Sequence, residues 1–109
     1  MKILAILAAL FLSIGYGHAQ TYEKFVEKSF DFLDKNDLVS AEESLRAAMH
    51  LEPGNPNNYA LLMNLGTIQR RQGKLEDALL SYTAALSRHP NNEAILENRA
   101  GLYTEMGEI

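Results

Sequence analysis

The tripeptide Pro-Asn-Asn occurs twice in this chain, beginning at Pro56 and at Pro90, and the two copies are 34 residues apart. Gly73 is followed by a second glycine, Gly107, at the same distance. A fixed period of this length is typical of proteins in which one small structural unit is stacked on the next. Because a single unit cannot bury its apolar face alone, the period predicts an array of stacked units.

Apolar residues recur at three- and four-residue spacing in five segments between Tyr22 and Gly107, and this pattern is typical of helices with one buried face. Thr21 is a suitable N-cap for the first helix. No segment alternates regularly enough to be expected as a strand. We therefore predict an all-α fold of antiparallel helix pairs. The expected breaks between the helices are Asn36-Asp37, Pro53-Gly54, Gly73 and Pro90.

Small residues recur in the second and fourth predicted helices. Helices whose axes lie roughly 8–10 Å apart need small side chains where they cross, and larger residues fill the space beside the crossing. We therefore expect both kinds of residue in the core. The small residues are Ala41, Ala48, Ala78 and Ala85, and the larger residues between them are Leu45 and Tyr82.

Residues 1–19 have the composition of a secretory signal peptide. Lys2 supplies a positive charge, residues 3–14 are apolar apart from one serine, and the small residues Gly17 and Ala19 precede a suitable cleavage site. The apolar run is shorter than the ~20 residues of a membrane-spanning helix, so we expect cleavage; an uncleaved membrane anchor is the alternative. The mature domain, residues 20–109, is predicted to be extracytoplasmic, either in a bacterial periplasm or secreted.

Charge and composition exclude several classes of function. The chain has 10 basic and 14 acidic residues and no cysteine. Binding to nucleic acid depends on basic residues that neutralise phosphates, so we do not expect it here. The sequence contains neither a cysteine nor a Gly-x-Ser-x-Gly motif, so it gives no support for nucleophilic catalysis. His50 and His89 occupy matching positions, but they lack a third ligand at a metal-like spacing. We predict a protein that is not an enzyme and has no metal or cofactor.

One set of positions in residues 59–92 follows a known pattern. These positions are Leu62, Leu65, Gly66, Gly73, Ala78, Tyr82, Ala85 and Pro90. At these positions the segment resembles a tetratricopeptide repeat. It departs from the usual pattern at two places, where Leu62 replaces an aromatic residue and Gln69 replaces a tyrosine. The resemblance implies a right-handed α-solenoid.

The flanking segments resemble the same repeat less closely. In residues 22–55, Lys28-Ser29 replaces the usual Leu-Gly pair and Asn36 replaces the turn glycine, while three surplus residues lengthen the turn after Pro53. Residues 93–109 match only the first helix of a third repeat. We expect the chain to be the N-terminal part of a longer repeat protein. The alternative is that the last helix forms an oligomer contact.

The resemblance implies a scaffold that binds a protein or peptide partner in a concave groove lined by the first helix of each pair. The broad apolar stripe on the first predicted helix independently indicates a second contact there. Carried over by position, the implied groove residues are Val26, Phe30, Leu33, Met63, Asn64, Thr67, Arg70, Arg71 and Asn98, with Gly101 and Glu105 beside them.

Alternatives remain for this groove. Arg70 and Arg71 would grip a ligand carboxylate bidentately, or they form a solvated helix end that interacts with the helix dipole. A clamp for carboxylate-terminated peptides is not expected, because Val26 and Phe30 stand where that clamp has lysine and asparagine. The alternative function is architectural: the repeats would drive self-assembly into a homo-oligomer or dock onto a downstream domain.

Overall fold

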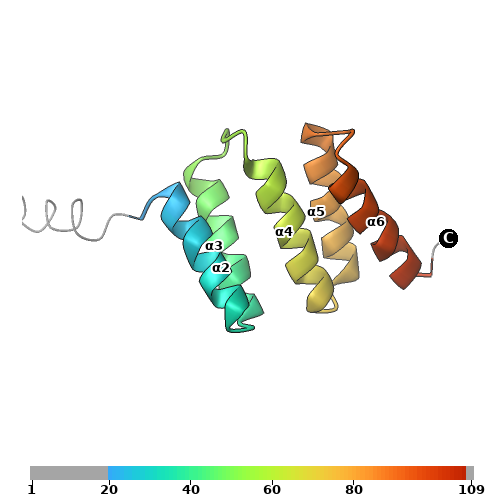
Figure 1. Ribbon diagram of the computed structural model, residues 1–109, viewed down its shortest axis with the longest axis horizontal. Helices are drawn as coiled ribbons and strands as arrows, with labels where there is room; N and C mark the ends of the chain where they lie inside the picture. Colours follow the sequence, from blue (N-terminus) through green and yellow to red (C-terminus); the bar gives the residue numbers. More distant parts are fainter. Residues whose placement is uncertain (1–19, 108–109) are drawn as a thin grey trace, which may run out of the picture.

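The computed structural model describes residues 20–107, which form helices and contain no strand. The prediction of an all-α fold is confirmed. The predicted signal peptide, residues 1–19, lies outside the described residues. The helices are α2 (Tyr22–Asp34), α3 (Leu38–Leu51), α4 (Asn58–Arg71), α5 (Leu75–Arg88) and α6 (Glu93–Glu105), as labelled in Figure 1.

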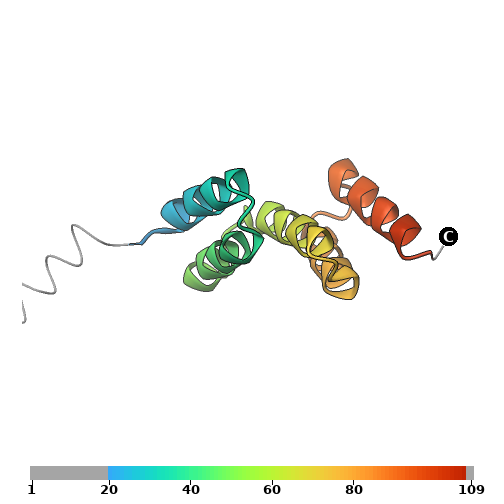
Figure 2. The ribbon, with the colours of Figure 1, turned by 90° about the horizontal axis from the view of Figure 1, so that it is seen from below.

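The helices form a stack of antiparallel pairs. α2 packs on α3 and α4 packs on α5, and the second helix of each pair also contacts the first helix of the next unit. Figure 2 shows α2, α4 and α6 along one side of the stack and α3 and α5 along the other. The first side is concave, because α2 and α6 lie nearer the top of this view than α4, which lies between them.

The core consists of two clusters, one between α2, α3 and α4 and the other between α4, α5 and α6. The small residues predicted at the helix crossings are fully buried, and so are Leu45 and Tyr82 beside them. The prediction of the core is therefore confirmed for both pairs. The small residues concerned are Ala41, Ala48, Ala78 and Ala85.

The two complete units fill their helix crossings with different pairs of residues. In the second unit a Cβ atom on Gly66 would lie 2.8 Å from the ring of Tyr82. In the first unit the equivalent positions hold Ser29 and Leu45, both buried. The Ser29 hydroxyl donates a hydrogen bond of 2.6 Å to the carbonyl oxygen of Val26. The smaller leucine leaves room for the serine side chain, so the replacement of glycine in the first unit has a steric explanation.

Equivalent residues after the first helix of each unit adopt a left-handed backbone conformation. The φ angles are +58° at Asn36, +79° at Gly73 and +74° at Gly107. Asparagine is one of the few residues other than glycine that adopt this conformation readily. Asn36 therefore preserves the helix ending although it departs from the repeat pattern. Its side-chain oxygen also accepts a hydrogen bond of 2.8 Å from Arg71, which links the first two units.

The two connections between units differ in length. Residues 52–57 join α3 to α4, whereas residues 89–92 join α5 to α6. The surplus after Pro53 therefore lengthens the first connection, as the sequence predicted. α4 and α6 have Cα atoms within 8 Å of each other, but no Cα atom of α2 lies this close to one of α4. The longer connection thus accompanies a wider separation between α2 and α4.

A buried hydrogen-bond network holds this wider joint together. The Tyr22 hydroxyl donates to the Asn58 side-chain oxygen over 2.9 Å, and the Asn58 amide donates to the carbonyl oxygen of Glu52 over 2.9 Å. Both side chains are buried. Burial of the hydroxyl, followed by the nearby carboxylates of Glu52 and Glu23, raises the pKa of Tyr22. The protonated hydroxyl is therefore the form that the folded joint favours.

The change Tyr22→Phe is expected to lower the free energy of unfolding by about 1 kcal/mol, because it removes one buried hydrogen bond and leaves the aromatic ring in place. Urea unfolding followed by circular dichroism measures this loss. Tyr103→Phe is the matched control, since the Tyr103 hydroxyl has no hydrogen bond within residues 20–107. Equal losses in the two variants would contradict the structural role of the Tyr22–Asn58 bond.

Candidate protein-binding surface

The groove residues predicted from the sequence all belong to α2, α4 and α6, the helices of the concave side (Figure 2). Along this side they divide into two parts with different chemistry. The part between α2 and α4 is an open, largely apolar cleft. The part between α4 and α6 is crossed by an arginine side chain that binds within the chain.

An open cavity of about 330 Å³ lies between α2 and α4, and we call it the inter-repeat cleft. It contains two of the predicted residues, Val26 and Phe30. Its position follows from the wider separation of these two helices. The lining residues are Tyr22, Glu23, Val26, Glu27, Phe30, Asn55, Asn57 and Leu61.

The apolar part of the inter-repeat cleft centres on Phe30, whose side chain is 51% exposed. Val26 is half-buried beside it, and Leu61 is buried on the α4 side. Burial of a large aromatic side chain is among the main sources of free energy in protein association. An aromatic ring that remains half exposed on a concave surface is therefore a candidate anchor point for a partner.

Acidic side chains accompany this apolar surface. Glu23 and Glu27 lie one helical turn apart on α2 and both are exposed. Glu27 forms an ion pair of 3.3 Å with Lys24, but both side chains are more than 60% exposed. A solvent-exposed pair of this kind contributes little, so it leaves the local charge accessible to a ligand.

Arg70 fills the space between α4 and α6. Its Nε atom donates a hydrogen bond of 2.9 Å to the Glu105 carboxylate, and Nη1 donates to the backbone carbonyl of Asn98 over 3.4 Å. The bond to Glu105 is the main cause that raises the pKa of Arg70. A Cβ atom on Gly101 would lie 3.2 Å from the guanidinium group. The absence of a side chain at Gly101 therefore leaves room for the Arg70 side chain. The groove residues of α4 and α6 thus contact each other.

Other predicted residues of the groove also have partners within the chain. Thr67 is exposed, and its hydroxyl shares a hydrogen bond of 2.8 Å with the Tyr82 hydroxyl. Leu33 is half-buried against the first core cluster, and Met63 against the second. Asn64 is half-buried, and its side chain has no hydrogen-bond partner within residues 20–107. Asn64 and Phe30 are therefore the predicted residues best placed to meet a ligand.

Sequence reasoning missed several residues of the inter-repeat cleft. Glu23 and Glu27 do not follow from the repeat pattern, because the pattern gives the position of a residue on its helix but not the distance between neighbouring helices. Asn55 and Asn57 belong to the lengthened connection, which has no equivalent in the pattern. The surplus of residues after Pro53 was the available signal, since a longer connection separates the units that it joins.

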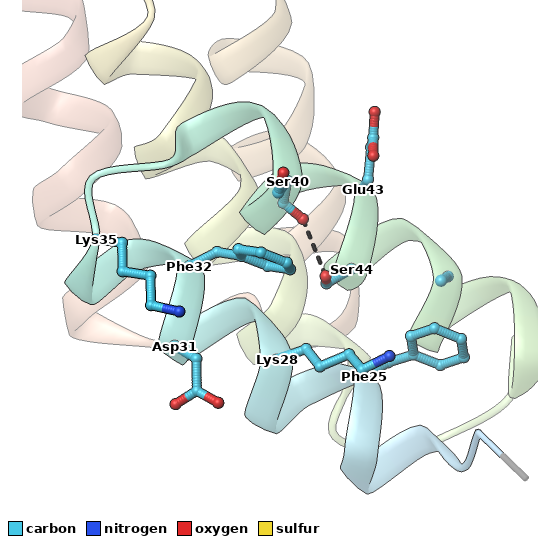
Figure 3. A pocket seen from close by; sticks show the side chains of 9 residues that line it. Phe25, Lys28, Asp31, Phe32, Lys35, Ser40, Glu43 and Ser44 are labelled. Atoms are coloured by element: carbon cyan, nitrogen blue, oxygen red, sulfur yellow. Dashed lines mark hydrogen bonds between the residues drawn. The ribbon is translucent and has the colours of Figure 1, made fainter. Parts of the chain in front are cut away.

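A second cavity, of about 440 Å³, opens on the outer side of α2 and α3 and is shown in Figure 3. In that view Lys28 extends beside Phe25, with its amino group 5.8 Å from the ring centre, and Ser44 donates a hydrogen bond to the carbonyl oxygen of Ser40. We call this surface the terminal face. Its residues are Phe25, Lys28, Asp31, Phe32, Lys35, Ser40, Glu43, Ser44 and Ala47.

The second unit shows how an equivalent face is covered. There Leu65 and Ile68 are buried, and α3 of the first unit packs on α4. On the terminal face the equivalent positions hold Lys28 and Asp31, which are both exposed. Two buried aliphatic residues are thus replaced by charged ones. Polar outer faces of this kind are typical of the end units of repeat arrays, where they maintain solubility.

Other kinds of site find no support in the described part of the chain. Residues 20–107 contain no group of three or more acidic, histidine or cysteine side chains arranged to hold a metal ion. None of the helices in the same range has the length and apolar content needed to cross a bilayer. The ring of His89 lies against Tyr59 with 3.9 Å between the ring centres, so this histidine has a packing role.

Comparison with known proteins identifies what the chain resembles. A family model described as Tetratricopeptide repeat matches residues 59–92. The crystal structure of a tetratricopeptide repeat protein from Parabacteroides merdae ATCC 43184 is 72% identical in sequence and matches with a TM-score of 0.80. That match covers 83% of this chain and 35% of the crystallised one.

Two curated relatives match more distantly. Photosystem I assembly protein Ycf3 from Synechococcus sp. (strain CC9605) is 26% identical over 110 aligned residues, covering 99% of this chain and 64% of the relative. General transcription factor 3C polypeptide 3 from Homo sapiens is 28% identical over 87 residues, covering 80% of this chain and 10% of the relative. The chain thus spans less than two thirds of the length of either relative.

Proposed function

Because this chain is a tetratricopeptide repeat protein, we propose that it acts as an exported, non-catalytic scaffold that binds a protein or peptide partner along its concave side. Tetratricopeptide repeats in general imply protein–protein interaction. The observation that carries the proposal for this chain is the half-exposed ring of Phe30 in the open inter-repeat cleft.

The hydrogen bonds and ion pairs that the groove residues form within the chain support binding of a ligand at the inter-repeat cleft. Between α4 and α6, Arg70 and Glu105 already satisfy each other, so a ligand there would have to displace a hydrogen-bonded ion pair. In the inter-repeat cleft, by contrast, a ligand would cover apolar surface that water now contacts. Removal of such surface from water contributes roughly 25 cal/mol per Å². We therefore place the main contact at Phe30 and a second contact at Asn64.

Export is supported by the composition of residues 1–19 and by the start of the fold. Thr21 is the N-cap of α2, and its side-chain oxygen accepts a hydrogen bond of 3.2 Å from the backbone amide of Lys24. Cleavage after Ala19 would leave this cap in place. The mature protein would thus keep every helix that the structure describes.

The terminal face is poorly suited to self-assembly through α2 and α3. A face that pairs with another copy is expected to be apolar at its centre, as the equivalent face of the second unit is. Lys28 and Asp31 instead place opposite charges on the terminal face. These charges suit contact with water.

Site-specific photocross-linking tests the proposed function. A photoreactive amino acid at Phe30 or at Asn64 is expected to give a cross-linked product of defined mass in the cells that produce the protein. The same amino acid at Thr83, an exposed position of α5 on the other side of the stack, is the matched control and should give none. Products from Thr83 alone, or from no position, would contradict binding on the concave side.

A further inference from the structure

We propose that the inter-repeat cleft binds a segment that presents a large apolar side chain next to basic residues. This inference rests on the proposed function and specifies the chemistry of the partner. It is based on two properties of the residues that line the cleft. The floor of the cleft is apolar, and the charged residues at its rim, Glu23 and Glu27, are both carboxylates.

The apolar floor fits one large side chain of a partner. Phe30 and Val26 on α2 face Leu61 on α4 across a cavity of about 330 Å³. This volume is at the lower end of the range of roughly 300–1,000 Å³ that ligand pockets occupy. The cavity is therefore suited to an anchoring side chain such as leucine or phenylalanine.

The charged residues that line this floor are of one sign, and the one lysine paired with them, Lys24, makes a solvent-exposed ion pair with Glu27 outside the lining. Glu23 and Glu27 are the charged residues among those that line the cleft, and no lysine or arginine is among them. Glu52 adds a third carboxylate nearby. It accepts a hydrogen bond of 3.0 Å from the Asn55 side-chain amide, and its charge contributes to the raised pKa of Tyr22. Surfaces that associate carry complementary charge, so this rim attracts a basic segment and repels an acidic one.

The neighbouring space between units shows the same complementarity within the chain. Between α4 and α6 the chain supplies its own cation, Arg70, which meets the Glu105 carboxylate. The position equivalent to Arg70 in the first unit holds Leu33. The first unit therefore sends no basic side chain from this position toward α4. Arg71, which takes the position equivalent to Glu105, bonds Asn36 and does not line the inter-repeat cleft, so the lining of the cleft contains no cation of this chain.

The connection between the units offers the partner a polar contact. Asn55 is already engaged, since its side-chain oxygen accepts a hydrogen bond from the backbone amide of Asn57 over 2.8 Å. The Asn57 side chain has no hydrogen-bond partner in the part of the chain that the structure describes. An asparagine amide both donates and accepts, so Asn57 is suited to the backbone of an extended peptide.

Fluorescence anisotropy with four labelled peptides tests the inference. The peptides share one alanine-rich frame and differ at two places: the central residue is leucine or serine, and the flanking charges are two lysines or two glutamates. The leucine–lysine peptide should bind best to the purified protein. Exchange of its lysines for glutamates should weaken binding about tenfold at low salt, because like charges would then meet at the rim.

Two sets of variants identify the groups responsible. Glu23→Gln combined with Glu27→Gln should weaken binding of the leucine–lysine peptide about fivefold and reduce its salt dependence, since two exposed ion pairs are lost. Asp31→Asn combined with Glu43→Gln removes the same charge from the terminal face and should leave binding unchanged. Phe30→Ala should weaken binding of both leucine peptides while helicity is retained, because Phe30 is half exposed.

The possible failures are distinguishable. Equal binding of the leucine–lysine and leucine–glutamate peptides, equal effects of the two double variants, or no binding of any peptide would overturn the basic–apolar preference. The proposed function would survive any of these results if cross-linking from Phe30 still captured a partner. Loss of peptide binding together with the absence of cross-linked products from both Phe30 and Asn64 would overturn the proposed function as well.

Discussion

Replacement of Tyr82 by alanine is expected to lower the free energy of unfolding by about 3–5 kcal/mol, the range measured for large aromatic residues in protein cores. Tyr82 is fully buried and has the largest side chain among the fully buried residues of the described chain. Its loss would leave a cavity beside Gly66 and remove one of the two hydrogen-bond partners of the Thr67 hydroxyl, the other being the Met63 carbonyl oxygen. Urea unfolding followed by circular dichroism measures the change.

Two controls separate burial from other effects of the change. Leu80→Ala lies on the same helix at a side chain that is 70% exposed, and it should change stability by less than about 0.5 kcal/mol. Tyr82→Phe removes only the hydroxyl and should lower stability by about 1 kcal/mol. A loss below about 1 kcal/mol for Tyr82→Ala would show that this face of α5 is not the core.

The change Gly66→Ser should also destabilise the protein, by about 1–3 kcal/mol. A Cβ atom at this position would lie 2.8 Å from two atoms of the Tyr82 ring, which is too close, so the fully buried ring or the helix would have to shift. Serine is the informative replacement because the first unit carries Ser29 at the equivalent position. The penalty therefore arises from the neighbour across the helix crossing, since the same residue is accepted in the same backbone setting.

Combination with Tyr82→Leu tests this steric explanation. The first unit pairs Ser29 with Leu45, so Gly66→Ser should cost less in a chain that already carries Tyr82→Leu than in the natural chain. A double-mutant cycle should give a coupling of about 1 kcal/mol or more. Gly54→Ser is the control, because a Cβ atom there meets nothing within 4 Å. Additive effects of the two changes would rule out direct contact as the cause.

The helices were predictable because each buries one face and each ends at a residue with a defined backbone role. The 3.6-residue period of apolar side chains reflects that face directly. Thr21 caps α2, and the left-handed residues Asn36 and Gly73 follow the ends of α2 and α4. These features depend on neighbours a few positions away, so a single sequence contains them. The small residues at the helix crossings were predictable for a related reason, because their spacing repeats with the period of the array.

The candidate site was predictable only in part, because its chemistry depends on distant contacts. Arg70 looked like a free basic residue at a helix end, yet it is bound to Glu105, 35 residues away. The bond from Tyr22 to Asn58 spans 36 residues. Repeat position indicates which side of a helix a residue occupies, but it does not show which partner reaches that residue.

The apolar stripe on α2 illustrates the same limit. Val26, Phe30 and Leu33 were expected together as surface that exceeds the needs of one partner helix. In the structure Val26 and Leu33 pack against the first core cluster, and Phe30 remains 51% exposed. Part of the excess apolar surface is therefore used by the wider joint between the units, and only part is offered to a ligand.

The unequal connections between units have a mechanical consequence. At the second joint both α5 and α4 approach α6 with Cα atoms within 8 Å. At the first joint only α3 approaches α4 this closely, and α2 and the turn after it are linked to the second unit by the side-chain hydrogen bonds Tyr22–Asn58 and Asn36–Arg71. Stability in a repeat array is close to a sum of the units and the contacts between neighbours. We therefore expect bending and local opening at the first joint, where the backbones of α2 and α4 are further apart, and a ligand bound between these helices is expected to stiffen the array there.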